Sequence, residues 1–163
     1  MSRTGVLVGA ALRDAPDARP PQQRDDLVMW SLTDPQQATR IVMDTSDHYV
    51  RQLLVRAVAV GESVAIYSEH PQRWESLTQP NIAVVDRRGA ADFVPTIVVN
   101  DRRTAPPSAG LSATVITLGR DAGGPTPDLR FVQTSESTVR VSSRAATLDL
   151  AIVAFRQEQA WTG

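Results

Sequence analysis

The sequence contains no cysteine and no lysine, and all 17 of its basic residues are arginines. Without cysteine the chain can form no disulfide, no thiolate metal site and no thiol nucleophile. Without lysine it has neither a Schiff-base lysine nor the lysine of a phosphate-binding loop. These two absences exclude several common catalytic and nucleotide-binding arrangements.

The sequence also has no long hydrophobic run and no excess of one charge. Its formal net charge is −1, so no overall positive field attracts it to nucleic acid or to an anionic membrane. No apolar stretch approaches the roughly 18 residues of a membrane-spanning helix, and the opening MSRTGVLVGA lacks a signal-peptide pattern. We therefore expect no membrane insertion by this chain itself, and a location in the cytosol or on its face.

Length and composition are those of a globular domain. The chain has 163 residues, of which 42% are hydrophobic and 21% charged. Such a chain can bury a sizeable core without a disulfide or a structural metal. We expect a single α/β domain over residues 1–155, followed by a polar tail over residues 156–163 that either frays or docks through Trp161.

The N-terminal half alternates apolar runs with helical patterns. The runs predict strands at residues 5–11, 27–32, 40–45, 63–68 and 81–86. A helix is predicted over residues 47–60, and Pro71 suits the first turn of a short helix that ends at Leu77. This order is typical of a parallel βαβαβ unit with right-handed crossovers.

The predicted helix at residues 47–60 has an apolar and a polar side. The apolar positions include Val50, Leu54 and Val58, and the polar positions are Arg51, Gln52 and Arg56. Thr45 or Ser46 can cap its first amides, and Gly61 can take the left-handed conformation that ends a helix. We expect the apolar side to cover a sheet.

Beyond residue 89 the pattern changes to short strand-like runs separated by turn-rich segments. The runs lie at residues 96–100, 113–118, 129–133, 138–142 and 148–155, with a hairpin turn predicted at residues 134–137. The expected fold class is therefore α/β. It has a Rossmann-like parallel βαβαβ N-terminal half and additional antiparallel strands in the C-terminal half.

Polar turns follow four of the predicted strands, at the edge where open parallel sheets bind ligands. The turns are Asp44-Thr45-Ser46, Tyr67-Ser68-Glu69-His70, Asp86-Arg87-Arg88 and Asn100-Asp101-Arg102-Arg103. One hypothesis is a small-ligand or nucleotide-binding regulatory site on this rim. The alternative is that these side chains only cap helices, and it is favoured because the turn after Asp44 has no glycine for close approach to a phosphate.

Metal and catalytic sites have little support in the sequence. The two histidines, His48 and His70, could form a metal or general-base site with Asp44, Glu69 or Asp86. They lack the spacing of a zinc-binding helix motif, and no serine stands in a nucleophile-elbow sequence. We expect no catalytic residue, no metal site and no cofactor.

Arg73, Trp74, Arg87 and Arg88 are the candidates for contact with a protein partner. Interface hot spots are enriched in tryptophan and arginine, and the short helix after Pro71 could present Arg73 and Trp74 to a partner. The alternatives are that Trp74 folds back over the sheet and that the arginine pair lies in a solvated loop.

Two segments carry a family resemblance: TGVLVG at residues 4–9 and SDHYVRQLLVRAVAVGESVAIYSEHPQRW at residues 46–74. They resemble the C-terminal cytosolic region of EccE proteins from mycobacterial type VII (ESX) secretion systems. In those proteins a GVLVG-like strand, a loop, a strand and a helix of the form xxQLVVRAxAxGxxV recur in this order. Gly61 and Val64 occupy the places where that helix stops and the next strand starts.

The resemblance implies a non-catalytic structural or assembly component that acts through protein–protein contacts. The implied partners are the EccB, EccC and EccD membrane-complex proteins, of which EccC supplies ATPase activity. The implied location is the cytosolic face of the plasma membrane, reached through the complex. Because family members carry hydrophobic segments ahead of this region, the chain would correspond to a fragment or a shortened relative.

Overall fold

A computed structural model describes residues 5–11, 27–32, 39–85, 93–101, 114–119 and 127–162. The strands are β1 (Val6–Ala11), β2 (Leu27–Trp30), β3 (Thr39–Asp44), β4 (Val64–Ser68), β5 (Ile82–Val85), β6 (Ile97–Asp101), β7 (Thr114–Leu118), β8 (Leu129–Ser135), β9 (Thr138–Ser143) and β10 (Thr147–Ala151). The helices are α1 (Asp47–Ala59), α2 (Gln159–Thr162) and the 3-10 helices η2 (Pro71–Leu77) and η3 (Arg156–Glu158). In this described part of the chain, no helix is long and apolar enough to cross a membrane.

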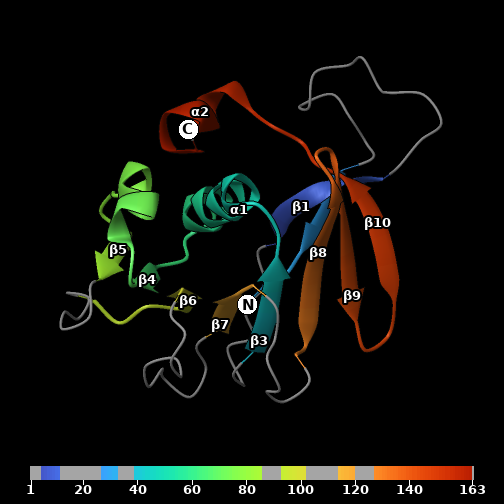
Figure 1. The fold of residues 1–163 in the computed structure, drawn as a ribbon, viewed down its shortest axis with the longest axis horizontal. Coiled ribbons are helices and arrows are strands. Elements are labelled where there is room, and N and C mark those ends of the chain that lie inside the picture. The colour runs from blue at the N-terminus through green and yellow to red at the C-terminus, as the bar shows by residue number, and fades with distance from the viewer. Residues whose placement is uncertain are drawn as a thin grey trace.

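All of these strands belong to one ten-stranded mixed sheet. Its strand order is β2-β1-β10-β9-β8-β3-β7-β6-β4-β5. The strands from β8 to β5 in this order pair in parallel, whereas those from β2 to β8 pair antiparallel. Figure 1 shows α1, α2 and η2 gathered on one side of the sheet.

The prediction of a Rossmann-like α/β fold is wrong, because the structure is a sheet-rich mixed fold. The strands that α1 connects, β3 and β4, are not neighbours, since β7 and β6 lie between them. Short apolar runs identify strands, but strand order depends on packing between distant segments. Consecutive strands are adjacent in only about two-thirds of cases, so the order along the chain did not determine the order in the sheet.

The positions of the individual elements agree well with the sequence analysis. Each predicted strand overlaps an observed one, although β10 stops at Ala151. The hairpin between β8 and β9 is confirmed, with Ser135 paired to Thr138. Both ends of α1 are also confirmed, because Ser46 Oγ accepts a hydrogen bond from Tyr49 N and Gly61 has φ of 103°.

Helix α1 is buried on more than its apolar side. Leu53 and Leu54 lie in the core, as expected, but Gln52 and Arg56 are only 2% and 7% exposed. Part of the polar side of the helix is therefore buried as well. The C-terminal residues are the reason, since α2 packs on α1 and the carboxylate of Glu158 pairs with Arg56.

Two long-range hydrogen bonds show that the sheet curls around α1. The hydroxyl of Tyr49 donates to the carbonyl oxygen of Val8 on β1 at 2.7 Å. The hydroxyl of Thr114 on β7 donates to the carbonyl oxygen of Leu32, just beyond the outer strand β2, at 2.8 Å. The antiparallel end of the sheet therefore returns towards its parallel centre, and α1 lies inside the curve.

Candidate functional site

The carboxyl ends of β4 and β6 and the start of α1 bring three polar residues together. Asp101 at the end of β6 accepts hydrogen bonds from Ser68 Oγ at 2.7 Å and from Trp74 Nε1 at 2.9 Å, both on Oδ2. Asp47, the first residue of α1, lies on the other side of Arg73. Of the predicted strand-end rim, the ends of β4 and β6 thus contribute Ser68 and Asp101 to a cluster of polar side chains.

Arg73 on η2 joins the two carboxylates of this cluster. Its Nη2 is 2.7 Å from Asp47 Oδ1, and its Nη1 is 3.2 Å from both oxygens of Asp101. The hydrogen bond with Asp47 raises the pKa of Arg73, burial acts in the opposite direction, and the charge of Asp101 adds to the increase. The side chains of Arg73 and Asp47 are 40% and 35% exposed, so a partner can reach both of them.

Trp74, the residue proposed beside Arg73 as a partner contact, is completely buried, with 0% exposure. The guanidinium groups of Arg51 and Arg73 lie 5.6 and 5.4 Å from the centre of its ring. This burial agrees with the alternative interpretation, in which Trp74 folds back over the sheet. A partner cannot touch this indole unless η2 moves.

The start of α1 offers little to an anionic ligand. Ser46 Oγ caps the helix, and the backbone amide of Ser46 donates to Gln133 Oε1 at 2.7 Å. Carboxylates of Asp47 and Asp101 stand where a phosphate would need donors, and Arg51 donates to the carbonyl oxygen of Arg73. Since carboxylates repel a phosphate, the geometry fits a fixed junction of α1, η2 and β6 better than a nucleotide site.

The other residues singled out in the sequence are not brought into this cluster. His48 lies on α1 and its Nδ1 contacts the carbonyl oxygen of Thr162, whereas His70 is exposed at the start of η2. Within the described residues, no group of three or more histidine, aspartate or glutamate side chains could hold a metal ion. Arg87 and Arg88 lie outside the described residues, as do Asp86, Arg102 and Arg103.

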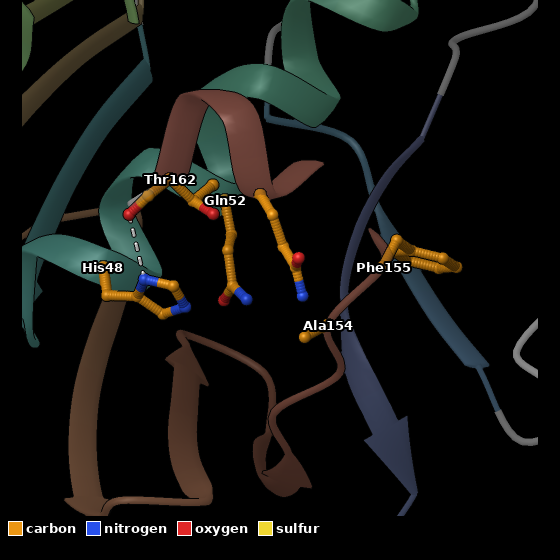
Figure 2. Close-up of a pocket in the computed structure, with 6 residues that line it drawn as sticks. His48, Gln52, Ala154, Phe155 and Thr162 are labelled. Carbon is orange, nitrogen blue, oxygen red and sulfur yellow. Dashed lines mark hydrogen bonds between the residues drawn. The ribbon is translucent and has the colours of Figure 1, made fainter. Parts of the chain in front are cut away.

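A cavity of about 410 Å³ lies between α1 and the C-terminal segment, and we call it the α1–α2 pocket (Figure 2). Its lining residues are His48, Gln52, Ala154, Phe155, Gln159 and Thr162. Gln52 is buried, and its side-chain oxygen has no hydrogen-bond partner in the structure. Sequence reasoning missed this pocket, since a glutamine on the polar side of a helix gives no signal of burial by a distant segment.

Comparison with known proteins gives a partial similarity. No protein-family model matches the sequence. Over 82 residues the chain is 27% identical to the ESX-2 secretion system protein EccE2 of Mycobacterium tuberculosis (strain CDC 1551 / Oshkosh). This stretch covers 50% of the chain but 13% of EccE2, so the chain corresponds to a small part of that protein. The chain is thus similar, over half its length, to a protein of an ESX secretion system.

Proposed function

We propose that this chain is an EccE-like, non-catalytic assembly component of a type VII (ESX) secretion complex. The observation that carries the proposal is the similarity to EccE2 over half of the chain. The proposed partners are EccB-, EccC- and EccD-type proteins. The proposed location is the cytosolic face of the plasma membrane, with attachment through the complex.

The geometry of the strand-end rim supports an assembly role over the nucleotide-binding alternative. Arg73 is held by Asp47 and Asp101, so its charge is compensated within the chain. A phosphate would have to displace these carboxylates and enter a site that holds two negative charges. A junction fixed by its own ion pairs is instead suited to presenting a constant surface to a partner.

Arg73 is the described residue that we propose for partner contact. Its side chain is 40% exposed, and the buried ring of Trp74 supports it from below at 5.4 Å. Arginine is enriched at interface hot spots, and a guanidinium with fixed neighbours loses little freedom on binding. Trp74 then acts by positioning Arg73, and Arg87 and Arg88 stay candidates on sequence grounds alone.

The test is affinity purification of the tagged, native-length protein from detergent-solubilised membranes of its own host, followed by identification of the proteins recovered. The expected result is recovery of EccB-, EccC- and EccD-type proteins together. Arg73→Ala should lower this recovery at an unchanged amount of folded bait. Arg140→Ala is the matched control, because Arg140 also forms an exposed ion pair but lies on β9. Recovery of the bait without these proteins would contradict the proposal.

A calorimetric titration distinguishes the assembly role from the nucleotide-binding alternative. With ATP, GTP and NAD as separate titrants, we expect no binding tighter than about 1 mM, which corresponds to about −4 kcal/mol. A micromolar isotherm for any of these nucleotides would favour the regulatory alternative and overturn the assembly role.

A further inference from the structure

The α1–α2 pocket contains a buried acceptor that the protein itself leaves unused. Gln52 is 2% exposed, and its Oε1 has no hydrogen-bond partner in the structure. In Figure 2 the side chain of Gln52 lies beside that of His48, and both line the pocket. A buried polar atom without a partner costs roughly 1–3 kcal/mol, so a group that donates to this oxygen would be bound favourably.

His48 presents a second acceptor to the same space. Its Nδ1 is 3.1 Å from the carbonyl oxygen of Thr162, and a carbonyl oxygen only accepts, so Nδ1 carries the proton. In the neutral imidazole the other nitrogen, Nε2, is then an acceptor. His48 and Gln52 are one helical turn apart on α1, so both side chains lie on the same face of the helix.

Thr162 adds to the acceptor character of the pocket. Its hydroxyl proton is used in a hydrogen bond to the carbonyl oxygen of Glu158 at 3.1 Å, which leaves lone pairs on Oγ1. Three of the lining side chains therefore offer acceptor atoms, from both α1 and α2. A matching ligand brings hydrogen-bond donors, such as N–H groups, to these acceptors.

The surroundings of the pocket favour a neutral ligand. No aspartate, glutamate or arginine lines it. The nearby charges of Arg56 and Glu158 form an ion pair with each other at 2.7 Å. A cation would gain no charge partner, and its positive charge would lie near the positive N-terminal end of α1.

We propose that the α1–α2 pocket binds a primary amide, whose NH2 group donates to Gln52 Oε1 and to His48 Nε2. A primary amide carries two N–H donors on one nitrogen and no net charge. A cavity of about 410 Å³ is within the size range of small-molecule pockets, about 300–1,000 Å³. The amide can belong to a free small molecule or to an asparagine or glutamine side chain of a peptide. This site is independent of the assembly function proposed above.

The test is an NMR titration of the full chain with benzamide, and with benzoate and benzamidine as matched probes. Benzoate has a similar shape but no N–H donor, and benzamidine has N–H donors but a positive charge. The expected result is saturable shifts at His48, Gln52 and Thr162 with benzamide, at a dissociation constant of about 1 mM or below. Absence of these shifts, or tighter binding of benzoate or benzamidine, would overturn the proposal.

Two variants assign the binding to the proposed acceptors. Gln52→Leu should weaken benzamide binding about tenfold, and so should His48→Ala, which changes an exposed residue and leaves the core intact. Gln72→Leu, an exposed glutamine on η2, is the matched control and should bind as the parent does. Unchanged binding by either pocket variant would show that water alone satisfies Gln52 and would overturn the proposal.

A further pair of probes distinguishes the two sources of the amide. The peptide acetyl-Gly-Gln-Gly-methylamide presents a glutamine side chain, and its glutamate counterpart lacks the NH2 group. Tighter binding of the glutamine peptide than of benzamide assigns the pocket to a protein segment, and the reverse assigns it to a small molecule. If the glutamate peptide binds as well as the glutamine peptide, the amide is not the recognised group and the proposal fails.

Discussion

Arg56 and Glu158 form a buried ion pair that fastens the C-terminal segment to α1. Arg56 Nε lies 2.7 Å from Glu158 Oε2, and Nη2 lies 3.0 Å from Oε1. The two side chains are 8% and 9% exposed. Arg56 also donates to the carbonyl oxygens of Leu7 and Val153, so one guanidinium connects α1, β1 and the segment after β10. The position of the α1–α2 pocket depends on this connection.

Glu158→Ala should destabilise the protein by about 3–5 kcal/mol, because it leaves the guanidinium of Arg56 buried without its counter-charge. Urea unfolding followed by circular dichroism measures the difference. Arg140→Ala is the control, since Arg140 and Asp149 form an ion pair at a similar distance but are 52% and 46% exposed. The control should leave the unfolding free energy nearly unchanged, because solvent screens an exposed ion pair. Equal effects of the two variants would mean that the C-terminal segment is not held by this pair.

Trp74→Phe should destabilise the protein by about 1–3 kcal/mol at neutral pH. The change keeps an aromatic ring but removes the hydrogen bond from Nε1 to Asp101 Oδ2, which spans 2.9 Å. Trp74→Ala should cost more, about 3–5 kcal/mol, because it also leaves a cavity at a fully buried position. Thermal and urea unfolding check both values. A Trp74→Ala variant as stable as the parent would contradict the complete burial of this indole.

The local structure was predictable because it depends on short segments. Ser46 before α1 and Gly61 after it are helix-capping residues, and both can be recognised from the residues next to them in the sequence. Strand β3 has a contiguous buried run, Ile41 to Met43, which sequence alone identifies as a buried strand. The order of strands could not be predicted in the same way, because insertion of β6 and β7 between β3 and β4 depends on contacts between distant residues.

The candidate site residues show the same difference between features set by neighbouring residues and features set by distant ones. Asp101 was predicted at the strand-end rim because it follows an apolar run, and the structure places it in the cluster with Arg73. Gln52 and Arg56 were placed on the polar side of the helix, and their burial was not predicted because one helix turn contains no information about Glu158, which is far away in the sequence. Trp74 could not be assigned to the surface or to the core, since tryptophan occurs both in protein cores and at interfaces. Long-range contacts, not residue type, decided each of these cases.

Leu54→Ala should destabilise the protein by about 2–5 kcal/mol. Leu54 is 1% exposed in the middle of α1, and the apolar stripe that predicted its burial faces the inside of the curled sheet. The unfolding free energies of variant and parent in urea give the value. Val55 on the same helix is only partly buried, so Val55→Ala should cost less. A difference below about 1 kcal/mol for Leu54→Ala would contradict the packing of α1 against the sheet.

The last prediction concerns the pH dependence of stability and Tyr49. Its side chain is 1% exposed, and its hydroxyl donates to the carbonyl oxygen of Val8 at 2.7 Å. Burial raises the pKa of Tyr49 above its ordinary value of 10.0, although the charge of Arg56 acts in the opposite direction. In the unfolded chain the hydroxyl ionises near the ordinary value, whereas in the folded chain it keeps its proton to higher pH.

The stability that Tyr49 contributes is therefore complete below about pH 10 and is lost as the pH rises above that value. The free energy of unfolding should fall by up to about 1.4 kcal/mol per pH unit in this range from Tyr49 alone. Tyr49→Phe should remove that slope and, at neutral pH, cost about 1 kcal/mol for the lost hydrogen bond. Urea unfolding between about pH 8 and 11 measures both effects. Tyr67→Phe is the control, because it leaves Tyr49 in place and should keep the slope due to Tyr49. An alkaline slope that persists in Tyr49→Phe would have to come from another group and would contradict the assignment.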